Sequence, residues 1–329
     1  MTNKIIAEIG SVHDGSFGNA CKLIEVAAKC GADIVKFQTH IAEAETLQDA
    51  PSPDYFSKEP RWEYFKRTGF TKYQWIELSS ICKENGIEFL SSPFSEEAVD
   101  LLEEVGVGAY KIPSGEVSNL PLLEYIARTG KTVYLSSGMS NWMELDEAVE
   151  ELEKSCQVVI MQCTSAYPCP PEKVGLNVIS EMGERYKLPV GFSDHTLGMA
   201  AGFAAAALGA TAIEKHLTFS RLMYGSDAPN GTEPEEFCEY CKGLRAIWKM
   251  NTHPVDKDNL SYLDEMRFVF QKSIVAAEDI NAGAAIKRKN LRYKKPGDAI
   301  PARNYKDVIG RRINRSVKRD EQIRYEDLI

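Results

Sequence analysis

The sequence predicts an α/β protein in which the first 250 residues form a (β/α)8 TIM barrel and the remainder forms a small β-rich domain. Short runs rich in β-branched or aromatic residues alternate with longer amphipathic stretches eight times. Eight strand–helix units in about 250 residues are typical of such a barrel. A doubly wound open sheet is the alternative, but it rarely needs eight units. In addition, the Gly-x-x-x-x-Gly at 10–15 lacks the Lys-Ser/Thr of a P-loop.

The expected elements follow one another in order along the chain. The strands cover residues 4–9, 33–39, 87–92, 108–113, 132–136, 157–163, 189–193 and 211–217. The helices cover residues 18–30, 73–84, 95–105, 120–129, 144–154, 173–186, 199–208 and 234–249. In the first helix Ala20, Leu23, Ile24 and Ala27 recur at the three- and four-residue spacing of one helical face. Gly31 and Gly106 follow helices at the position where a left-handed cap is expected.

Two regions depart from this alternation. The stretch 41–70 is long, aromatic and Pro-rich, and we expect it to act as a lid or a packing excursion, since loops of that length are usually functional or disordered. Residues 251–265 have the composition of a linker, and residues 266–329 contain short apolar runs separated by turn signals. The predicted domains are therefore a barrel over 1–250, a linker over 251–265 and a small β domain over 266–329.

The net charge of −9 is unevenly distributed. Residues 266–329 contain 16 Lys and Arg against 8 Asp and Glu, a net charge of +8, which leaves −17 for the rest of the chain. An acidic body with a basic tail is not typical of a nucleic-acid-binding protein as a whole. The tail could bind nucleic acid, dock on an acidic protein surface, cover an anionic substrate or simply be a solvated basic face.

The sequence predicts a cytoplasmic protein with reduced thiols. No apolar run approaches the roughly 20 residues that cross a bilayer, and the N-terminus lacks the layout of a signal peptide. The eight cysteines are irregularly spaced and several fall in expected helices, which favours free thiols. Cys238 and Cys241 form an isolated C-x-x-C that we interpret as two ordinary helix residues.

Polar side chains stand at the end of every expected strand, where (β/α)8 barrels carry their active sites. These residues are Glu8, His13, Lys36, Gln38, Ser91, Ser92, Lys111, Ser114, Glu116, Ser136, Ser137, Gln162, Thr164, Tyr167, Ser193, Asp194, His195, Glu214 and His216. His195 and His216 follow neighbouring strands, and a converging imidazole pair suits Mn²⁺ or a similar divalent ion. Lysines and hydroxyls suit a phosphate or carboxylate. His40 and His253 we interpret as incidental.

This residue set suggests carbon–carbon bond formation with a phosphorylated small molecule, because a metal ion can polarise a carbonyl beside an anion site. Two alternatives stay open. Lys36, Lys111 or Lys215 could form a Schiff base, as in a class I aldolase, which predicts activity without metal and trapping by borohydride. The protein could also be a non-catalytic carbohydrate-binding barrel, which predicts no release of phosphate.

Eight segments in order along the barrel resemble the sialic acid synthase family, which includes N-acetylneuraminate, legionaminate and pseudaminate synthases. They are Ile-Ala-Glu-Ile-Gly-Ser-Val-His-Asp-Gly-Ser (6–16), Gly-Ala-Asp-Ile-Val-Lys-Phe-Gln-Thr-His (31–40), Ser-Ser-Pro-Phe (91–94), Tyr-Lys-Ile-Pro-Ser-Gly-Glu (110–116), Leu-Ser-Ser-Gly-Met (135–139), Gln-Cys-Thr-Ser-Ala-Tyr-Pro (162–168), Phe-Ser-Asp-His-Thr-Leu-Gly (192–198) and Glu-Lys-His-Leu-Thr (214–218). The tail resembles the antifreeze-like (SAF) domain of that family.

The resemblance implies that phosphoenolpyruvate condenses with the open-chain aldehyde of an N-acylated mannosamine-type sugar, giving a nine-carbon 2-keto acid and phosphate. The expected metal ligands are His195 and His216, and Lys36, Lys111 and Glu116 complete the expected catalytic set. Lys36, Ser92, Lys111, Ser114, Ser136 and Ser193 would hold phosphoenolpyruvate. The sugar would contact Asp14, Gln38, Tyr167, Asp227 and Lys295. The resemblance also implies a domain-swapped homodimer in which the tail of one subunit completes the sugar site of the other, with neither nucleic acid nor membrane as a partner.

The chain departs from the family pattern mostly at positions that concern the sugar. Ser11-Val12 stands where many relatives have an Asn before the His, and Ser165 stands where some have Asn. Ser92 replaces a frequent Thr, and Lys295 replaces a frequent Arg, which is not equivalent at a bidentate site. The segment 223–227 is closer to the neuraminate-type relatives than to the pseudaminate ones, so N-acetylneuraminate is the expected product, with legionaminate or pseudaminate as alternatives.

Overall fold

The computed structural model describes residues 2–52 and 59–329, which form two compact units, Met1–His253 and Pro254–Ile329. The first unit ends just after its last helix, α10 (Pro234–Asn251). The expected linker over 251–265 is therefore divided between the end of this helix and the second unit. Within the described residues, no helix is long and apolar enough to cross a membrane.

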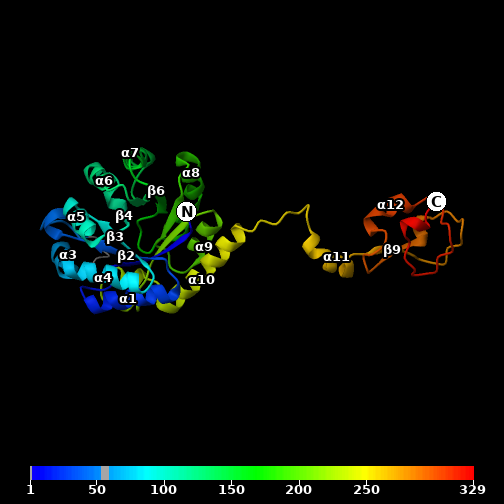
Figure 1. Cartoon of the computed structure of the whole chain (residues 1–329), viewed down its shortest axis with the longest axis horizontal. Coiled ribbons are helices and arrows are strands. Elements are labelled where there is room, and N and C mark those ends of the chain that lie inside the picture. Colours follow the sequence, from blue (N-terminus) through cyan, green and yellow to red (C-terminus); the bar gives the residue numbers. More distant parts are fainter. Residues whose placement is uncertain (1, 53–58) are drawn as a thin grey trace. The chain divides into compact units, whose positions relative to one another are not determined.

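Eight parallel strands close into a barrel in chain order, as the sequence predicts (Figure 1). They are β1 (Lys4–Gly10), β2 (Ile34–Thr39), β3 (Glu88–Pro93), β4 (Ala109–Ile112), β5 (Thr132–Ser136), β6 (Val158–Cys163), β7 (Val190–Asp194) and β8 (Ala212–His216). The barrel closes where β1 pairs with β8, which places Glu8 opposite His216. All eight carboxyl ends therefore face one side of the barrel.

Helices surround the strands (Figure 1). They are α1 (Phe17–Cys30), α4 (Lys72–Glu84), α5 (Glu96–Val105), α6 (Leu120–Ala127), α7 (Trp142–Glu153), α8 (Leu176–Tyr186), α9 (Ala200–Ala207) and α10. The starts of α1 and α5 are capped by Ser16 and Ser95, whose side chains accept hydrogen bonds from backbone N–H groups. Gly31 and Gly106 end the same helices at φ values of 92° and 80°, which glycine adopts without strain.

Two apolar layers leave the carboxyl end of the barrel free for polar side chains. One layer packs the helices against the outside of the strands. The other fills the barrel interior and consists of Ile6, Ile34, Leu90, Tyr134, Val159, Met161 and Ala212. The interior residues that follow along the strands, such as Lys36 and Glu214, are polar and also buried.

The excursion after β2 contains α2 (Ala42–Glu45) and α3 (Arg61–Thr68), which share a small apolar cluster, and α3 contacts the barrel end. Tyr64 of α3 is fully buried and donates a 2.8 Å hydrogen bond to Ser11 Oγ in the loop after β1. Residues 53–58, on which part of the lid prediction falls, lie outside the described residues. The described part of this stretch therefore fits a packing excursion over the carboxyl end of β1.

The second unit is small and rich in loops, as the sequence predicts. It contains an antiparallel pair, β9 (Ser273–Ala276) and β10 (Leu291–Lys294), and two short helices, α11 (Asp264–Phe270) and α12 (Tyr305–Val308). Its core consists of Ile274, Ala276, Ile280, Ile286, Leu291, Ile300, Val308, Ile313, Val317 and Ile323. This unit thus has an apolar core of its own.

One expectation about the cysteines is wrong. Cys30, at the end of α1, and Cys238, in α10, form a disulfide across a Cα–Cα distance of 4.2 Å. The two helices are neighbours because the barrel closes, although the residues are 208 positions apart in sequence. Cys238 and Cys241 are both helical, as expected, and Cys241 is a free thiol like Cys21, Cys82, Cys156, Cys163 and Cys169.

Candidate active site

The rings of the two histidines that the sequence singles out lie close together at the carboxyl end of the barrel. His195 directly follows β7 and His216 ends β8, and the centroids of their rings are 5.8 Å apart. The ring of Tyr167 lies 4.3 Å from that of His195 and 6.3 Å from that of His216. Neighbouring parallel strands therefore bring the imidazoles together, as the strand order predicts.

The nitrogen atoms of this pair fit the requirements of a metal ligand. His216 Nδ1 is buried and has no hydrogen-bond partner among the residues that the structure describes. Burial lowers the pKa of His216 to about 4, so the ring is neutral at physiological pH. His195 Nδ1 lies 3.0 Å from the carbonyl oxygen of Thr164. If that nitrogen donates to the carbonyl in a neutral ring, the lone pair of His195 is on Nε2, an arrangement common among metal-bound histidines.

Among the described residues, no group of three or more His, Cys, Asp or Glu side chains is arranged to hold a metal ion. Cys163 Sγ lies 3.7 Å from His195 Nδ1, which is the same nitrogen that contacts the Thr164 carbonyl. Burial of His195 opposes its protonation, but Cys163 and the Thr164 carbonyl raise its pKa, so a cation would compete with a proton for this ring. A cation at His195 and His216 would need water or substrate oxygens to complete its coordination.

A cluster of four buried charges, Glu8, Lys36, Lys111 and Glu214, lies among the strand ends. Lys36 Nζ is 2.5 Å from Glu8 Oε2 and 3.6 Å from Glu214 Oε1, and Lys111 Nζ is 3.1 Å from the same Glu214 oxygen. That oxygen also accepts a 2.7 Å hydrogen bond from Ser193 Oγ. The sequence identified both lysines as anion ligands but did not identify the two glutamates as their partners.

The two carboxylates of this cluster have different protonation tendencies. Burial raises the pKa of Glu8 to about 7, against the opposing effect of Lys36. Burial also opposes ionisation of Glu214, but Lys111 and Lys36 hold its pKa well below the ordinary value. Glu214 is therefore ionised at neutral pH, whereas Glu8 titrates there.

The serines expected to hold an anion are at the same end of the barrel. Ser92 Oγ is buried and has no hydrogen-bond partner among the described residues, and Ser136 is buried at the end of β5. Ser114 Oγ accepts a 3.1 Å hydrogen bond from the backbone N–H of Gly138. A Cβ on Gly138 would lie 2.6 Å from Ser114 Oγ, so only glycine allows this close contact.

Three of the expected sugar ligands belong to the loops and strand ends around this cluster. Gln38 Nε2 donates a 3.1 Å hydrogen bond to Glu8 Oε1. Asp227 Oδ2 accepts hydrogen bonds of 2.9 Å from Ser11 N and 3.0 Å from Ser11 Oγ. A Cβ on Gly10, which has a φ of +52°, would lie 2.4 Å from that carboxylate oxygen, so glycine is required there. Asp14 Oδ1 is 2.8 Å from Arg67 Nη2 of α3.

The other two expected residues of the catalytic and sugar sets are less closely tied to the imidazole pair. Glu116 is half-buried and its Oε2 accepts a 2.8 Å hydrogen bond from Asn119 Nδ2, while burial raises its pKa. Lys295 belongs to the second unit, where its Nζ lies 4.7 Å from the ring centroid of Phe270. The roles of both residues stay predictions.

His40, which we interpreted as incidental from the sequence, lies packed beside the expected sugar ligand Gln38. Its ring is stacked between Phe65 and Phe94, at centroid distances of 3.7 and 4.1 Å. Its Nδ1 is 2.7 Å from Glu45 Oε1 and its Nε2 is 3.3 Å from Gln38 Oε1. The Gln38 amide is therefore held from both sides, by Glu8 and by His40. The only sequence signal was the spacing of His40 two residues after Gln38.

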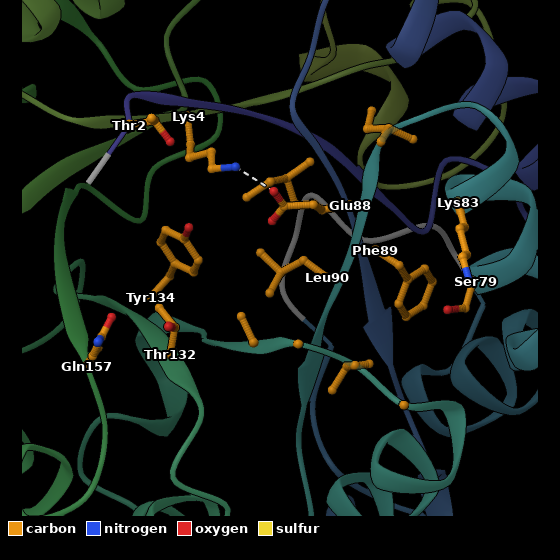
Figure 2. A pocket seen from close by; sticks show the side chains of 16 residues that line it. Thr2, Lys4, Ser79, Lys83, Glu88, Phe89, Leu90, Thr132, Tyr134 and Gln157 are labelled. Carbon is orange, nitrogen blue, oxygen red and sulfur yellow. Dashed lines mark hydrogen bonds and ion pairs between the residues drawn. The ribbon is translucent and has the colours of Figure 1, made fainter.

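A cavity of about 600 Å³ lies at the opposite, amino-terminal end of the strands (Figure 2). Figure 2 shows Leu90 and Tyr134 of the interior layer beside it, and Lys4 and Glu88 paired across its rim at 2.5 Å. None of the residues that the sequence selects lines this cavity. Catalysis in (β/α)8 barrels takes place at the carboxyl ends of the strands, so we place the candidate active site at the imidazole pair and the charge cluster.

Known proteins match nearly the whole of this chain. The sequence model of the NeuB family matches residues 23–256, and that of the SAF domain matches residues 271–329. The N,N'-diacetyllegionaminic acid synthase of Campylobacter jejuni is 38% identical, covering 97% of this chain and 98% of that protein. The N-acetylneuraminate-9-phosphate synthase of Homo sapiens is 34% identical, covering 98% and 91%. The crystal structure of an N-acetylneuraminic acid synthetase from Leptospira borgpetersenii, in complex with citrate, superposes with a TM-score of 0.72 at 29% identity, covering 82% and 91%.

Proposed function

The chain belongs to the NeuB family of sialic-acid-type synthases, and on that premise we propose that it condenses phosphoenolpyruvate with an N-acylated amino sugar. The products are a nine-carbon 2-keto acid and inorganic phosphate. The 38% identity with a diacetyllegionaminic acid synthase favours N,N'-diacetyllegionaminic acid as the product, in place of the N-acetylneuraminate expected from the sequence. N-acetylneuraminate is the second candidate, because the human relative, at 34% identity, is named for its 9-phosphate.

One observation carries the proposal: two buried lysines and two buried imidazoles meet at the carboxyl end of one barrel. Lys36 and Lys111 suit the phosphate and carboxylate of phosphoenolpyruvate, and Ser92 offers a hydroxyl without a partner among the described residues. When bound by His195 and His216, a divalent cation, Mn²⁺ in our proposal, supplies Lewis acidity for the sugar aldehyde. In this proposal Gln38, Tyr167 and Asp227 orient the sugar, and the contacts of Gln38 with Glu8 and of Tyr167 with His195 support that role.

The proposed reaction has two stages. C3 of phosphoenolpyruvate attacks the aldehyde carbon, and water then adds at C2, after which phosphate leaves with cleavage of its C–O bond. Lys36 and Lys111 neutralise the phosphoenolpyruvate anion and hold it against the aldehyde, and burial of the cluster strengthens these interactions. Glu116, whose pKa is raised by burial, is our candidate for the group that carries a proton between solvent and the reacting oxygen atoms.

The test offers phosphoenolpyruvate and Mn²⁺ with a panel of mannosamine-type and diacetamido-dideoxy sugars, and it measures phosphate release and product mass. We expect release that depends on the sugar and stops with a chelator. His216→Ala should abolish turnover, whereas His253→Ala, at an exposed position just after α10, should not. Activity that survives chelation and is trapped by borohydride would instead indicate a Schiff-base lysine. Binding of sugar without phosphate release would indicate a non-catalytic barrel.

We also propose a domain-swapped homodimer in which the SAF domain of one subunit completes the sugar site of the other. The charges of +8 on residues 266–329 and −17 on the rest of the chain favour such docking. Mixing two inactive forms tests it: a chain ending at His253, which keeps both imidazoles, and full-length His216→Ala, which keeps the tail. Recovery of turnover on mixing is expected, and full activity of the truncated chain alone would contradict the proposal.

A further inference from the structure

A buried ion pair lies directly behind the two imidazoles. Asp194 immediately precedes His195, Lys215 immediately precedes His216, and the register of β7 and β8 sets Asp194 opposite Lys215. Lys215 Nζ is 2.9 Å from Asp194 Oδ2, and both side chains are at most 2% exposed. Side chains alternate along a strand, so this pair faces outward to the helices while Ser193 and Glu214 face the barrel interior.

The carboxylate of Asp194 binds four donors. Its Oδ1 accepts hydrogen bonds from the backbone N–H of Thr196 at 2.9 Å and from the Thr196 hydroxyl at 2.7 Å. Its Oδ2 accepts from Lys215 and, at 3.0 Å, from the hydroxyl of Tyr240 in α10. Lys215 also donates a 2.8 Å hydrogen bond to the Thr196 carbonyl. The residues before and after His195 are thereby both tied to the residue before His216.

The neighbouring helices are shaped around this network. Tyr240 is fully buried, and a Cβ on Gly202 of α9 would lie only 1.6 Å from its hydroxyl oxygen. Only glycine at position 202 therefore allows Tyr240 to reach Asp194. The network thus connects the ends of β7 and β8 to α10 through the hydrogen bond from Tyr240 to Asp194, and the close approach of Gly202 leaves Tyr240 little freedom to move.

We propose that Asp194, Thr196, Lys215 and Tyr240 form a positioning clamp that fixes the separation and orientation of His195 and His216 for a divalent cation. This inference rests on the proposed function, in which these imidazoles bind the metal. A role in stability alone does not account for the pair, because buried ion pairs can often be replaced by apolar residues without loss of stability. A role in positioning the imidazoles does account for the ion pair, because the pair lies one residue before each imidazole and on the opposite face of both strands.

The test compares Mn²⁺ affinity in full-length variants, measured by electron paramagnetic resonance of the free ion, with thermal unfolding recorded alongside. We expect Lys215→Met to weaken Mn²⁺ binding by about 10- to 100-fold, as outer groups that orient metal ligands usually do. Lys215→Arg should restore part of the affinity, because it returns a cation to Asp194. The double variant Asp194→Leu with Lys215→Met, the apolar pair, has no unpaired buried carboxylate. It therefore tests the same prediction if Lys215→Met alone does not fold.

Leu152→Ala is the matched control, since Leu152 is fully buried in α7 and lies outside the network. It should lower the unfolding temperature without changing Mn²⁺ affinity. Wild-type affinity in Lys215→Met and in the apolar pair would overturn the clamp while leaving the metal site in place. An equal loss of Mn²⁺ affinity in Leu152→Ala and in Lys215→Met would also overturn the clamp. Absence of Mn²⁺ binding by the unaltered protein would overturn the metal assignment of the proposed function, and this inference with it.

Discussion

Lys111 Nζ lies 3.1 Å from Glu214 Oε1, at the carboxyl end of the barrel. The same oxygen accepts a hydrogen bond from Ser193 and is 3.6 Å from Lys36 Nζ. One buried carboxylate therefore binds three of the residues that we assign to phosphoenolpyruvate. An anionic substrate must share these donors with Glu214, so the affinity of the site depends on the balance of charge within the cluster.

Replacing Lys111 by Met should weaken phosphoenolpyruvate binding by more than about 10-fold, because substrate and Glu214 both lose a buried cation. Loss of one partner of a buried pair costs about 3–5 kcal/mol of folding free energy. Calorimetric titration with phosphoenolpyruvate and thermal unfolding measure the two effects. Adding Glu214→Gln removes the stranded charge and returns the net charge of the cluster to its wild-type value, so it should recover stability and part of the affinity, but not the contact that Lys111 makes with the substrate.

The control for this variant is Lys131→Met. Lys131 pairs with Glu103 at 2.5 Å, but the side chains are 25% and 40% exposed. Exposed pairs contribute at most about 1 kcal/mol, so stability should fall only slightly and phosphoenolpyruvate affinity should not change. Unaltered affinity in Lys111→Met would remove Lys111 from the proposed substrate site.

Anion binding should weaken as the pH rises through about 7. Burial raises the pKa of Glu8 to about 7, and the nearby charges are those of Lys36, Glu214 and Lys111. With Glu8 protonated and the other three charged, the cluster carries a net charge of +1, and ionisation of Glu8 brings it to zero. Phosphoenolpyruvate affinity should therefore fall between about pH 6 and pH 8 in the wild type.

Glu8→Gln provides the comparison, because it keeps an acceptor for Gln38 and stays neutral at every pH. The ionisation of phosphoenolpyruvate itself affects both proteins equally, so the difference between the two pH profiles isolates Glu8. We expect a flatter profile in the variant. Two superimposable profiles would show that Glu8 does not titrate in this range.

The fold was predictable because its signals are local. Apolar alternation located the first strand at 4–9, against the observed Lys4–Gly10, and the first helix at 18–30, against Phe17–Cys30. Parallel strands in chain order then require that the residues at their ends meet, which is why the convergence of His195 and His216 followed from the sequence. The rule that active sites of (β/α)8 barrels lie at strand ends applies to every polar residue at these positions, so it does not predict which of them contact one another.

Pairings made by closure of the barrel were not predictable. Glu8 and Lys36 are on neighbouring strands, but Glu214 reaches Lys111 across the barrel interior, and no pattern in the sequence indicates that distance. Cys30 and Cys238 meet only because the first and last helices become neighbours. His40 looked ordinary because its role depends on two phenylalanines from separate segments.

The Cys30–Cys238 bond predicts a specific count of reactive thiols. Alkylation of the denatured, unreduced protein should modify six cysteines, and alkylation after reduction should modify all eight, as mass spectrometry can determine. Cys238→Ser should lower stability by up to about 5 kcal/mol, because the bond closes a loop of more than 200 residues. Cys156→Ser, at a free thiol, is the control for the count. Eight modified cysteines without reductant would show that the bond does not form in solution.

His40→Phe should raise the KM for the sugar by about 2- to 10-fold and leave the KM for phosphoenolpyruvate unchanged. The new ring keeps the stack between Phe65 and Phe94 but cannot bond to Gln38 Oε1, which His40 contacts at 3.3 Å. A single hydrogen bond contributes about 0.5–1.5 kcal/mol, which corresponds to that range. Steady-state kinetics with each substrate varied in turn separates the two constants.

His40→Phe also removes the imidazole partner of Glu45, whose side chain is buried and only 4% exposed. The double variant His40→Phe with Glu45→Leu removes this complication and should show the same shift in the KM for the sugar with better stability. His253→Phe, at an exposed position, should change neither constant. Equal changes in both KM values would mean that His40 supports the barrel end in general, whereas a change confined to the sugar identifies His40 as the residue that orients Gln38.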